Sequence, residues 1–220
     1  MKKTLLISLL MSCSVAALAQ APAQVDTSAL PAWKPEALSE VSANFIYFFP
    51  SQQWSGFYDN MYGFEAQYRY WLSKPFGLAV AGGVMNANVR KDNPNLIDPA
   101  EGTFTDSATM IPLGVSGLVN VFDKYDWRLN LEAGIRYVFI NSDIRLNYSD
   151  GTSEGVDMEN AVVGVFMLDL DRKLTDEFAL FAGAGVQVDI SPGEMSTASM
   201  DLFDNNLKGY SLRLGAKYSF

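Results

Sequence analysis

Ten charged residues lie on one side of segments in which apolar and polar residues alternate. Their side chains are of types that could take part in chemistry. Alternation of apolar and polar residues with a period of two indicates β-strands with two unlike faces. Carboxylates and cations enclosed together could form a structural plug of salt bridges, or a gated narrow pore that opens when ions change partner. The ten residues are Glu40, Glu65, Arg69, Arg128, Glu132, Arg136, Asp169, Asp189, Arg213 and Lys217.

The chain of 220 residues contains no histidine, which is the side chain best suited to general-base catalysis near neutral pH. Its single cysteine is Cys13, so neither a Ser-His nor a Cys-His nucleophile can form in the mature protein. Two carboxylates could act alone, as in glycoside hydrolysis, but no pair stands out from the general acidic load. We therefore expect a protein that is not an enzyme and that carries no cofactor.

The first nineteen residues have the features of a secretory signal peptide. Lys2 and Lys3 precede a short apolar stretch, and Ala17-Leu18-Ala19 forms a cleavage site. Cys13 lies inside this leader, either as an apolar residue lost on cleavage or as the acceptor of a loose lipoprotein motif. The sequence therefore predicts secretion through the inner membrane, with a mature chain that begins at Gln20.

Charge and hydropathy exclude two classes of protein. Without Lys2 and Lys3 the chain retains 14 basic against 25 acidic residues, a net charge of −11, so we expect no nucleic-acid partner. The mature part has no run of 18 apolar residues, which excludes a helical membrane protein. Residues 20–37 contain three prolines and no periodicity, and are interpreted as a flexible periplasmic segment before a single domain at 38–220.

Eight segments of the domain alternate, and each is long enough for a tilted strand to cross a membrane. In residues 127–140, for example, the even positions carry Arg128, Asn130, Glu132 and Arg136, whereas the odd positions are apolar. The predicted strands are 40–49, 62–72, 77–90, 109–122, 127–140, 158–170, 178–190 and 207–220.

The connections alternate in length, as they do in outer-membrane barrels. Short turns at 73–76, 123–126 and 171–177 alternate with long loops at 50–61, 91–108, 141–157 and 191–206. An even number of strands places both termini on the short-turn side, which is predicted to be the periplasm. Acidic residues of the long loops predict a solvated rim, with a weaker alternative of a divalent-cation site near Asp157 and Glu159. They are Asp92, Asp98, Glu101, Asp106, Asp143, Asp150, Glu154, Asp157, Glu159, Glu194, Asp201 and Asp204.

The two faces of the strands indicate lipid outside and a polar interior. The face opposite the ten charges carries no charge in the middle of any span, whereas a soluble lipocalin-like barrel would turn its apolar face inward. Aromatic residues gather near both ends of the strands, including Trp71 at the short-turn level and Trp54 at the long-loop level. The predicted fold is all-β, a closed eight-stranded antiparallel transmembrane β-barrel.

With this pattern, the leader site and the final Tyr218-Ser219-Phe220, the chain resembles the small eight-stranded outer-membrane barrels of the OmpA and OmpX type. The resemblance implies a monomer in the cell outer membrane, among lipid and lipopolysaccharide. It also implies that Tyr218 and Phe220 are an assembly signal, read by the barrel assembly machinery after delivery by periplasmic chaperones. Because this fold serves many functions, we expect a structural or surface-contact role, with a narrow ion or small-solute channel as the alternative.

The register suggests how the interior charges pair. Arg128 is expected to pair with Asp169, and Glu40 with Arg69 or Lys217. Glu65, Glu132, Arg136 and Arg213 are expected to form a layer in the middle of the barrel, where eight strands leave room only for side chains. Asn130, on the same inner face, is expected to tolerate polar substitution.

Overall fold

A computed structural model describes residues 39–51, 58–89, 101–198, 201–205 and 207–220 of the chain, without the side chains of 201–205. The predicted leader, the segment 20–37, Trp54, Asp92 and Asp98 lie outside these residues. Among the described residues no helix is long and apolar enough to cross a membrane.

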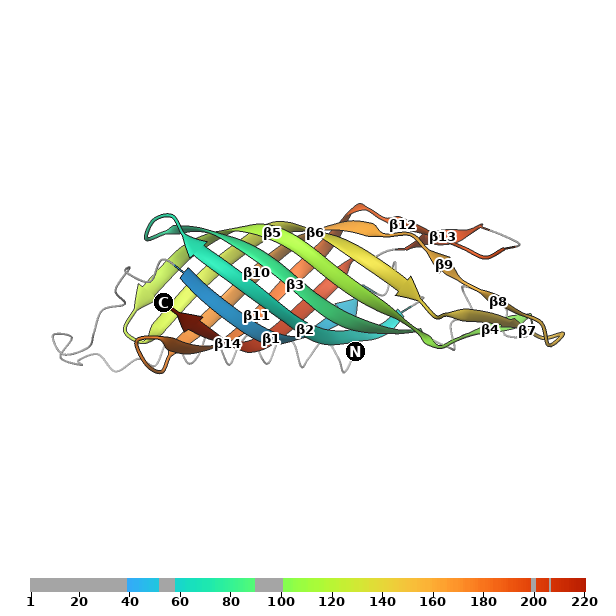
Figure 1. Cartoon of the computed structure of the whole chain (residues 1–220), viewed down its shortest axis with the longest axis horizontal. Coiled ribbons are helices and arrows are strands. Elements are labelled where there is room, and N and C mark those ends of the chain that lie inside the picture. Colours follow the sequence, from blue (N-terminus) through green and yellow to red (C-terminus); the bar gives the residue numbers. More distant parts are fainter. Residues whose placement is uncertain (1–38, 52–57, 90–100, 199–200, 206) are drawn as a thin grey trace. The chain divides into compact units, whose positions relative to one another are not determined.

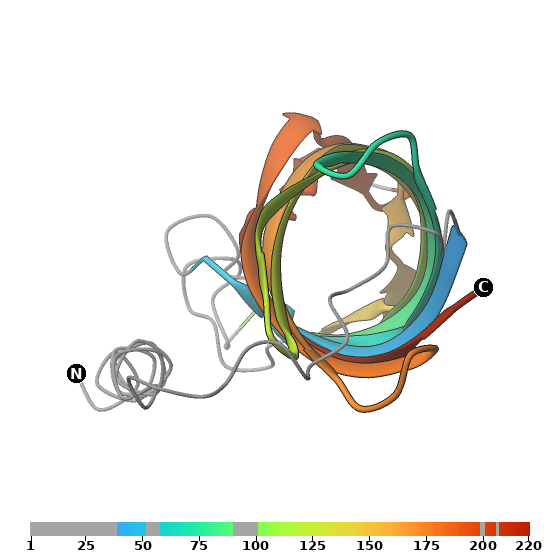
Figure 2. The ribbon, with the colours of Figure 1, turned by 90° about the vertical axis from the view of Figure 1, so that its left-hand side faces the viewer.

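Eight long strands form a closed antiparallel barrel, and this confirms the predicted fold (Figures 1 and 2). Around the ring the order is β1-β14-β11-β10-β6-β5-β3-β2, and β14 closes the barrel against β1. Each predicted strand corresponds to one barrel strand, with its ends shifted by a few residues. The barrel strands are β1 (Ser39–Pro50), β2 (Tyr58–Trp71), β3 (Phe76–Val89), β5 (Ser107–Lys124), β6 (Trp127–Ser142), β10 (Ala161–Lys173), β11 (Phe178–Ser191) and β14 (Gly209–Ser219).

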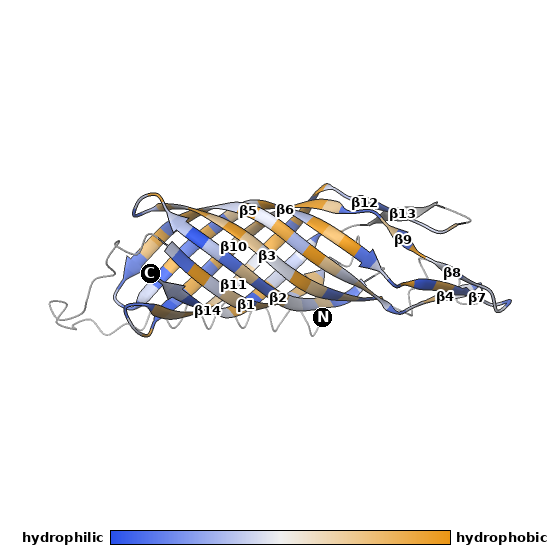
Figure 3. Ribbon diagram, in the orientation of Figure 1, coloured by the Kyte–Doolittle hydropathy of each residue, from blue (hydrophilic) through white to orange (hydrophobic). Residues whose placement is uncertain are grey.

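The outward face of the strands is apolar, as the alternation predicts. Phe64, Val115, Ile135, Phe166 and Leu214 all expose more than half of their surface on this face. In Figure 3 the colours along each barrel strand alternate accordingly between apolar and polar residues. An apolar band of this size on the outside of a closed barrel is typical of contact with hydrocarbon.

The long loops carry strands of their own, which the sequence did not predict. β4 (Gly102–Thr105), β7 (Arg145–Tyr148) and β8 (Ser153–Gly155) form one three-stranded sheet. β9 (Asp157–Met158), β12 (Gly193–Ser196) and β13 (Asp201–Asn205) form another. Residues predicted as a solvated rim thus belong in part to two small sheets at the long-loop end (Figure 1).

The interior is polar, as predicted, in only part of its height. Towards the long-loop end the inward residues are apolar, beginning with Phe48 and Met61 where β1 and β2 approach their connection. They pack in one buried cluster with Phe104 and Leu146 of the first small sheet and Met195 of the second. The remaining buried members are Tyr58, Ala87, Val89, Ala108, Met110, Val138, Ile144, Val156, Ala161, Val163, Val165 and Leu207. The loops and the upper barrel therefore share one hydrophobic core.

A second, smaller apolar cluster lies at the short-turn end. Trp71, assigned by the sequence to an aromatic band, is 7% exposed and points inward, where it packs with Ala79 and Leu118. Trp71 is the last residue of β2, so its inward position follows from the same alternation that places Arg69 inside. Between the two apolar clusters lies the charged part of the interior.

Replacement of Ile135 by Arg should lower the free energy of unfolding in lipid vesicles by about 2–4 kcal/mol, because it places a cation at mid-depth in hydrocarbon. The same change at Tyr125, in the turn between β5 and β6, should cost at most about 1 kcal/mol. Denaturant titration of both variants measures the difference. Equal losses would contradict the placement of β6 across the membrane.

Candidate functional site

Among the described residues, ten charged side chains fill the middle and short-turn part of the interior, five carboxylates and five cations, so this cluster is neutral. Each is at most 3% exposed. The carboxylates are Glu40, Glu65, Glu132, Asp169 and Asp171, and the cations are Arg69, Arg128, Arg136, Arg213 and Lys217. Nine of these residues were singled out from the sequence; Asp171 was not.

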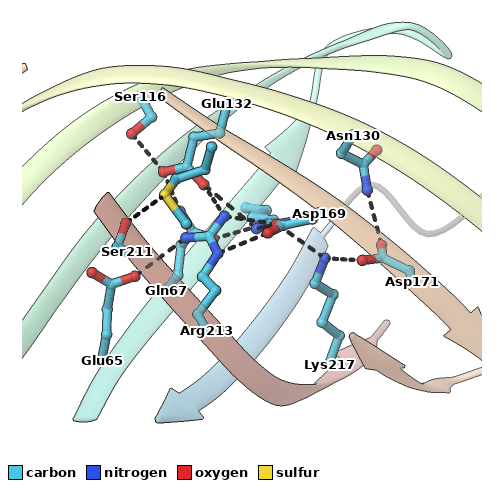
Figure 4. A network of polar contacts seen from close by, with 12 residues as sticks. Glu65, Gln67, Ser116, Asn130, Glu132, Asp169, Asp171, Ser211, Arg213 and Lys217 are labelled. Atoms are coloured by element: carbon cyan, nitrogen blue, oxygen red, sulfur yellow. Dashed lines mark hydrogen bonds and ion pairs between the residues drawn. The ribbon is translucent and has the colours of Figure 1, made fainter. Parts of the chain in front are cut away.

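Arg213 of β14 lies at the centre of the cluster (Figure 4). Its Nε and Nη2 donate to the two oxygens of Asp169, both at 2.7 Å, in the bidentate geometry that an arginine fork allows. Nη2 also donates to Oε2 of Glu132 at 2.5 Å, and Nη1 lies 3.4 Å from Oε1 of Glu65. One guanidinium therefore holds carboxylates from β10, β6 and β2 together across the lumen.

Arg136 and Arg69 complete this middle layer. Nη1 of Arg136 lies 2.5 Å from Oε2 of Glu65. Nη2 of Arg69 donates to Oδ2 of Asp169 at 2.7 Å, and it lies 3.6 Å from Glu132. The structure thus brings Glu65, Glu132, Arg136 and Arg213 together, with Arg69 and Asp169 as further members.

Neutral side chains satisfy the remaining oxygen of Glu132. Nε2 of Gln67 and Oγ of Ser116 donate to its Oε1 at 3.0 and 2.9 Å. Oε1 of Gln67 in turn accepts a bond from Nε of Arg69. Buried charges cost least when both their partners and their hydrogen bonds are supplied, and Glu132 has both.

Two predicted pairs are wrong, and the end of β10 explains the first. Because β10 continues to Lys173 instead of ending at Leu170, Asp171 faces the lumen and lies in register with Arg128. Nε of Arg128 donates to Oδ2 of Asp171 at 3.1 Å, so Arg128 does not pair with Asp169. Nζ of Lys217 binds the other oxygen of Asp171 at 2.5 Å.

Glu40 provides the second correction. It stands directly opposite Arg69 in the β1–β2 register, yet its Oε1 lies 2.6 Å from Nη2 of Arg128. Arg69 turns instead towards Asp169 in the middle layer. In so narrow a lumen, side chains from opposite walls compete with those of the neighbouring strand for the same partner.

Asn130 is also part of the cluster, and its expected tolerance of polar substitution stays a prediction. It is 1% exposed, donates to Oδ2 of Asp171 at 2.9 Å, and accepts a bond from Asn120. Asp189, by contrast, lies outside the group of ion pairs. Near the long-loop end of β11, its Oδ1 accepts a bond from the backbone N–H of Leu207 at 2.9 Å.

Aromatic rings close the lower side of the cluster. Nζ of Lys217 lies 4.3 Å from the centroid of the Phe181 ring, and the guanidinium carbon of Arg128 lies 5.2 Å from that of Trp71. Such cation–π contacts stabilise a cation that is buried away from water. From the sequence, Trp71 was assigned to an aromatic band and Phe181 was not singled out, although both occupy positions on the charged face.

Small residues on the remaining strands make room for the charges. Gly183 of β11 stands opposite both Asp169 and Arg213, and a Cβ there would collide with both side chains. Gly114 of β5 stands opposite Arg136, with whose Cγ a Cβ would likewise clash. The long charged side chains of β2, β6, β10 and β14 thus occupy space that the small inward residues of neighbouring strands leave open.

Tyr218 and Phe220 point outward at the end of the chain and are 44% and 61% exposed. Their rings stack at a centroid distance of 6.3 Å, and the Tyr218 hydroxyl bonds Oε2 of Glu177 at 3.1 Å. Their role in assembly stays a prediction. Within the described part of the chain, no group of three or more His, Cys, Asp or Glu is arranged to hold a metal ion.

Several solved structures share this architecture. The outer membrane protein OprG from Pseudomonas aeruginosa superposes with a TM-score of 0.60 at 11% identity, over 84% of this chain and 96% of that one. The fold is that of the small eight-stranded outer-membrane barrels. A major outer membrane protein from Thermus thermophilus superposes with a TM-score of 0.54 at 14% identity, over 83% of this chain and 99% of that one. Neisserial surface protein A superposes with a TM-score of 0.50 at 12% identity, over 83% of this chain and 97% of that one. No protein-family model and no curated protein sequence matches the chain.

Replacement of Arg213 by Met should destabilise the barrel by about 3–5 kcal/mol, because it leaves buried carboxylates without their shared cation. Adding Glu132→Gln to that variant restores neutrality and should recover part of the loss. Urea unfolding of both single variants and the double variant gives the coupling energy. Strict additivity of the two losses would contradict the contact between these side chains.

Gly183→Ala should destabilise the barrel by about 1–3 kcal/mol, since the new methyl group displaces Asp169 and Arg213. Gly117→Ala is the matched control, because a Cβ there meets nothing nearer than the Ala133 carbonyl oxygen, at 3.9 Å. Thermal unfolding monitored by circular dichroism compares the two. A loss for Gly117→Ala as large as for Gly183→Ala would refute a specific role for Gly183 in the cluster.

Proposed function

We propose that this protein is a non-conducting, non-enzymatic barrel of the cell outer membrane that presents its long-loop end for contact with surfaces. The observation that carries the proposal is the filled lumen, in which an apolar cluster, a neutral ion cluster and the Trp71 cluster succeed one another. The exposed apolar wall supports the membrane location independently of any similarity.

The filled lumen argues against the channel alternative. To open a path for ions, the ion pairs of the middle layer would have to separate. The apolar cluster towards the long-loop end, which includes Phe48, Met61 and Val163, would have to separate as well. A switch of partners among the salt bridges leaves that cluster in place. The ion pairs therefore support a structural plug rather than a gate.

The carboxylates also lack the arrangement that catalysis needs. Each of the five lies within ion-pair distance of at least one cation. A catalytic carboxylate must reach a substrate, whereas these five are at most 3% exposed. With no histidine in the chain, this favours a non-catalytic role.

The long-loop end has the features of a contact surface. Phe104, Leu146 and Met195 are buried beneath the two small sheets, in the core that the loops share with the upper barrel. Among the described residues of this end, exposed carboxylates outnumber the exposed cations Arg145 and Lys208. The exposed carboxylates are Asp59, Glu101, Asp106, Asp143, Asp150, Asp157, Glu159 and Glu194.

This surface favours a cationic partner. Hydrogen bonds from the Thr152 hydroxyl and backbone N–H lower the pKa of Asp150, at the tip of the β7–β8 hairpin, below its ordinary value. That carboxylate therefore remains charged in mildly acidic surroundings. We further propose that the barrel is a monomer packed by outer-membrane lipid and lipopolysaccharide, and assembled through recognition of Tyr218 and Phe220.

Two measurements test this proposal. In planar lipid bilayers the refolded protein should give no conductance steps. Immobilised polylysine should retain the refolded barrel in a salt-sensitive manner, and Asp143→Asn with Asp157→Asn and Glu194→Gln should weaken retention severalfold.

The matched control neutralises three carboxylates at the other end, Asp126, Asp176 and Glu177, and should leave retention unchanged. Regular conductance steps would overturn the closed lumen. Equal weakening by both triple variants would overturn the contact role of the long-loop end.

A further inference from the structure

We propose that Lys124, Trp127 and Arg172 bind the phosphate headgroup of an anionic phospholipid on the outer wall, at the short-turn end of the barrel. The three residues lie on neighbouring strands β5, β6 and β10. Trp127 is in register with Lys124 on one side and Arg172 on the other, so the three side chains lie side by side on the outward face. All three are exposed.

These three residues lie at the edge of the outward apolar band, on the short-turn side. The next outward residues along the same strands are Phe122, Leu129 and Leu170, which are again mutually in register. Acyl chains lying on these residues would bring a headgroup to the two cations. Trp at such a boundary keeps its ring on the apolar side and its N–H towards water.

Neither cation has an acidic partner within the described residues. The guanidinium carbon of Arg172 lies 5.5 Å from the centroid of the Trp127 ring, and Nζ of Lys124 lies 5.3 Å from that of Tyr125. These aromatic contacts orient the cations and leave their N–H groups free to donate. A guanidinium offers two parallel donors, the geometry that a phosphate accepts.

The nearby carboxylates do not neutralise this pair. Asp123 stands opposite Arg128 on the inner side of β5, and Asp176 pairs with Lys173 at 2.7 Å. Asp126, in the turn beside Trp127, is then the one remaining carboxylate of the described chain near Lys124 and Arg172. Two cations against one carboxylate leave this part of the outer wall with a net positive charge. Elsewhere on the rim, Glu177 accepts the Tyr218 hydroxyl.

Two strand spacings separate Lys124 from Arg172, about 10 Å across the wall. That span lets a phosphate diester lie over Trp127 and receive donors from both sides. A zwitterionic headgroup would bring its own ammonium towards two cations, whereas phosphatidylglycerol adds only a neutral glycerol. The site should therefore select anionic over zwitterionic phospholipid.

Native mass spectrometry of the detergent-solubilised barrel, titrated with phosphatidylglycerol or phosphatidylcholine, tests this site. The wild type should retain one phosphatidylglycerol more firmly than phosphatidylcholine. Arg172→Gln or Lys124→Gln should each weaken phosphatidylglycerol retention about fivefold, and the double variant about 25-fold, at about 1 kcal/mol per cation. Lys74→Gln, the same change in another turn of the same end, is the control and should retain the lipid as the wild type does.

Inorganic phosphate at the same concentration should not displace the lipid, because the acyl chains contribute to binding on Phe122, Leu129 and Leu170. Circular dichroism and resistance to sodium dodecyl sulfate verify that each variant is folded. Equal retention of the two lipids, an unchanged double variant, or a loss in Lys74→Gln as large as in Arg172→Gln would each overturn the site. Displacement by free phosphate would reduce it to a general anion site and would overturn the proposed lipid.

Discussion

A neutral set of five carboxylates and five cations, enclosed in a lumen too narrow for bulk water, is the constraint on which the barrel depends. Because removal of one member leaves its partners charged and buried, the ten residues act as a unit rather than as separate pairs. Arg213 embodies this, since one guanidinium binds carboxylates from three other strands. The need for space explains why Gly183 and Gly114 face the same layer.

The upper interior obeys a different rule, that of an ordinary hydrophobic core. Phe48 and Val163 of the barrel pack with Phe104 and Leu146 of a loop sheet. The loops are therefore a packed part of the fold. A contact surface supported in this way loses little entropy on binding. The same packing blocks the lumen above the charges, which links the proposed surface role to the absence of conduction that we expect.

The sequence predicted the strands and their outward faces because period-two alternation is a local property that lipid contact enforces. It did not predict partners inside the lumen, which depend on side chains reaching across the barrel. Asp171 was missed because the strand was ended at Leu170, although Asp169, Asp171 and Lys173 continue the alternation. The apolar upper lumen was visible in Ile46, Phe48, Val163 and Val165, all on the inward side. The loop sheets carried no comparable period in their short strands.

The central claim is that a dry, neutral ion cluster fills the lumen, and hydrogen exchange of the Arg213 side chain tests it most directly. Nε–H of Arg213 donates to Asp169 at 2.7 Å, and its proton should be visible by nuclear magnetic resonance of the refolded barrel in micelles. In a dry, neutral cluster this proton should exchange slowly, and its rate should not change in about 1 M salt, where the Debye length falls to about 3 Å. Exchange at the rate of free arginine, or a signal that shifts with salt, would mean that water and ions enter the lumen and would contradict a dry, closed interior.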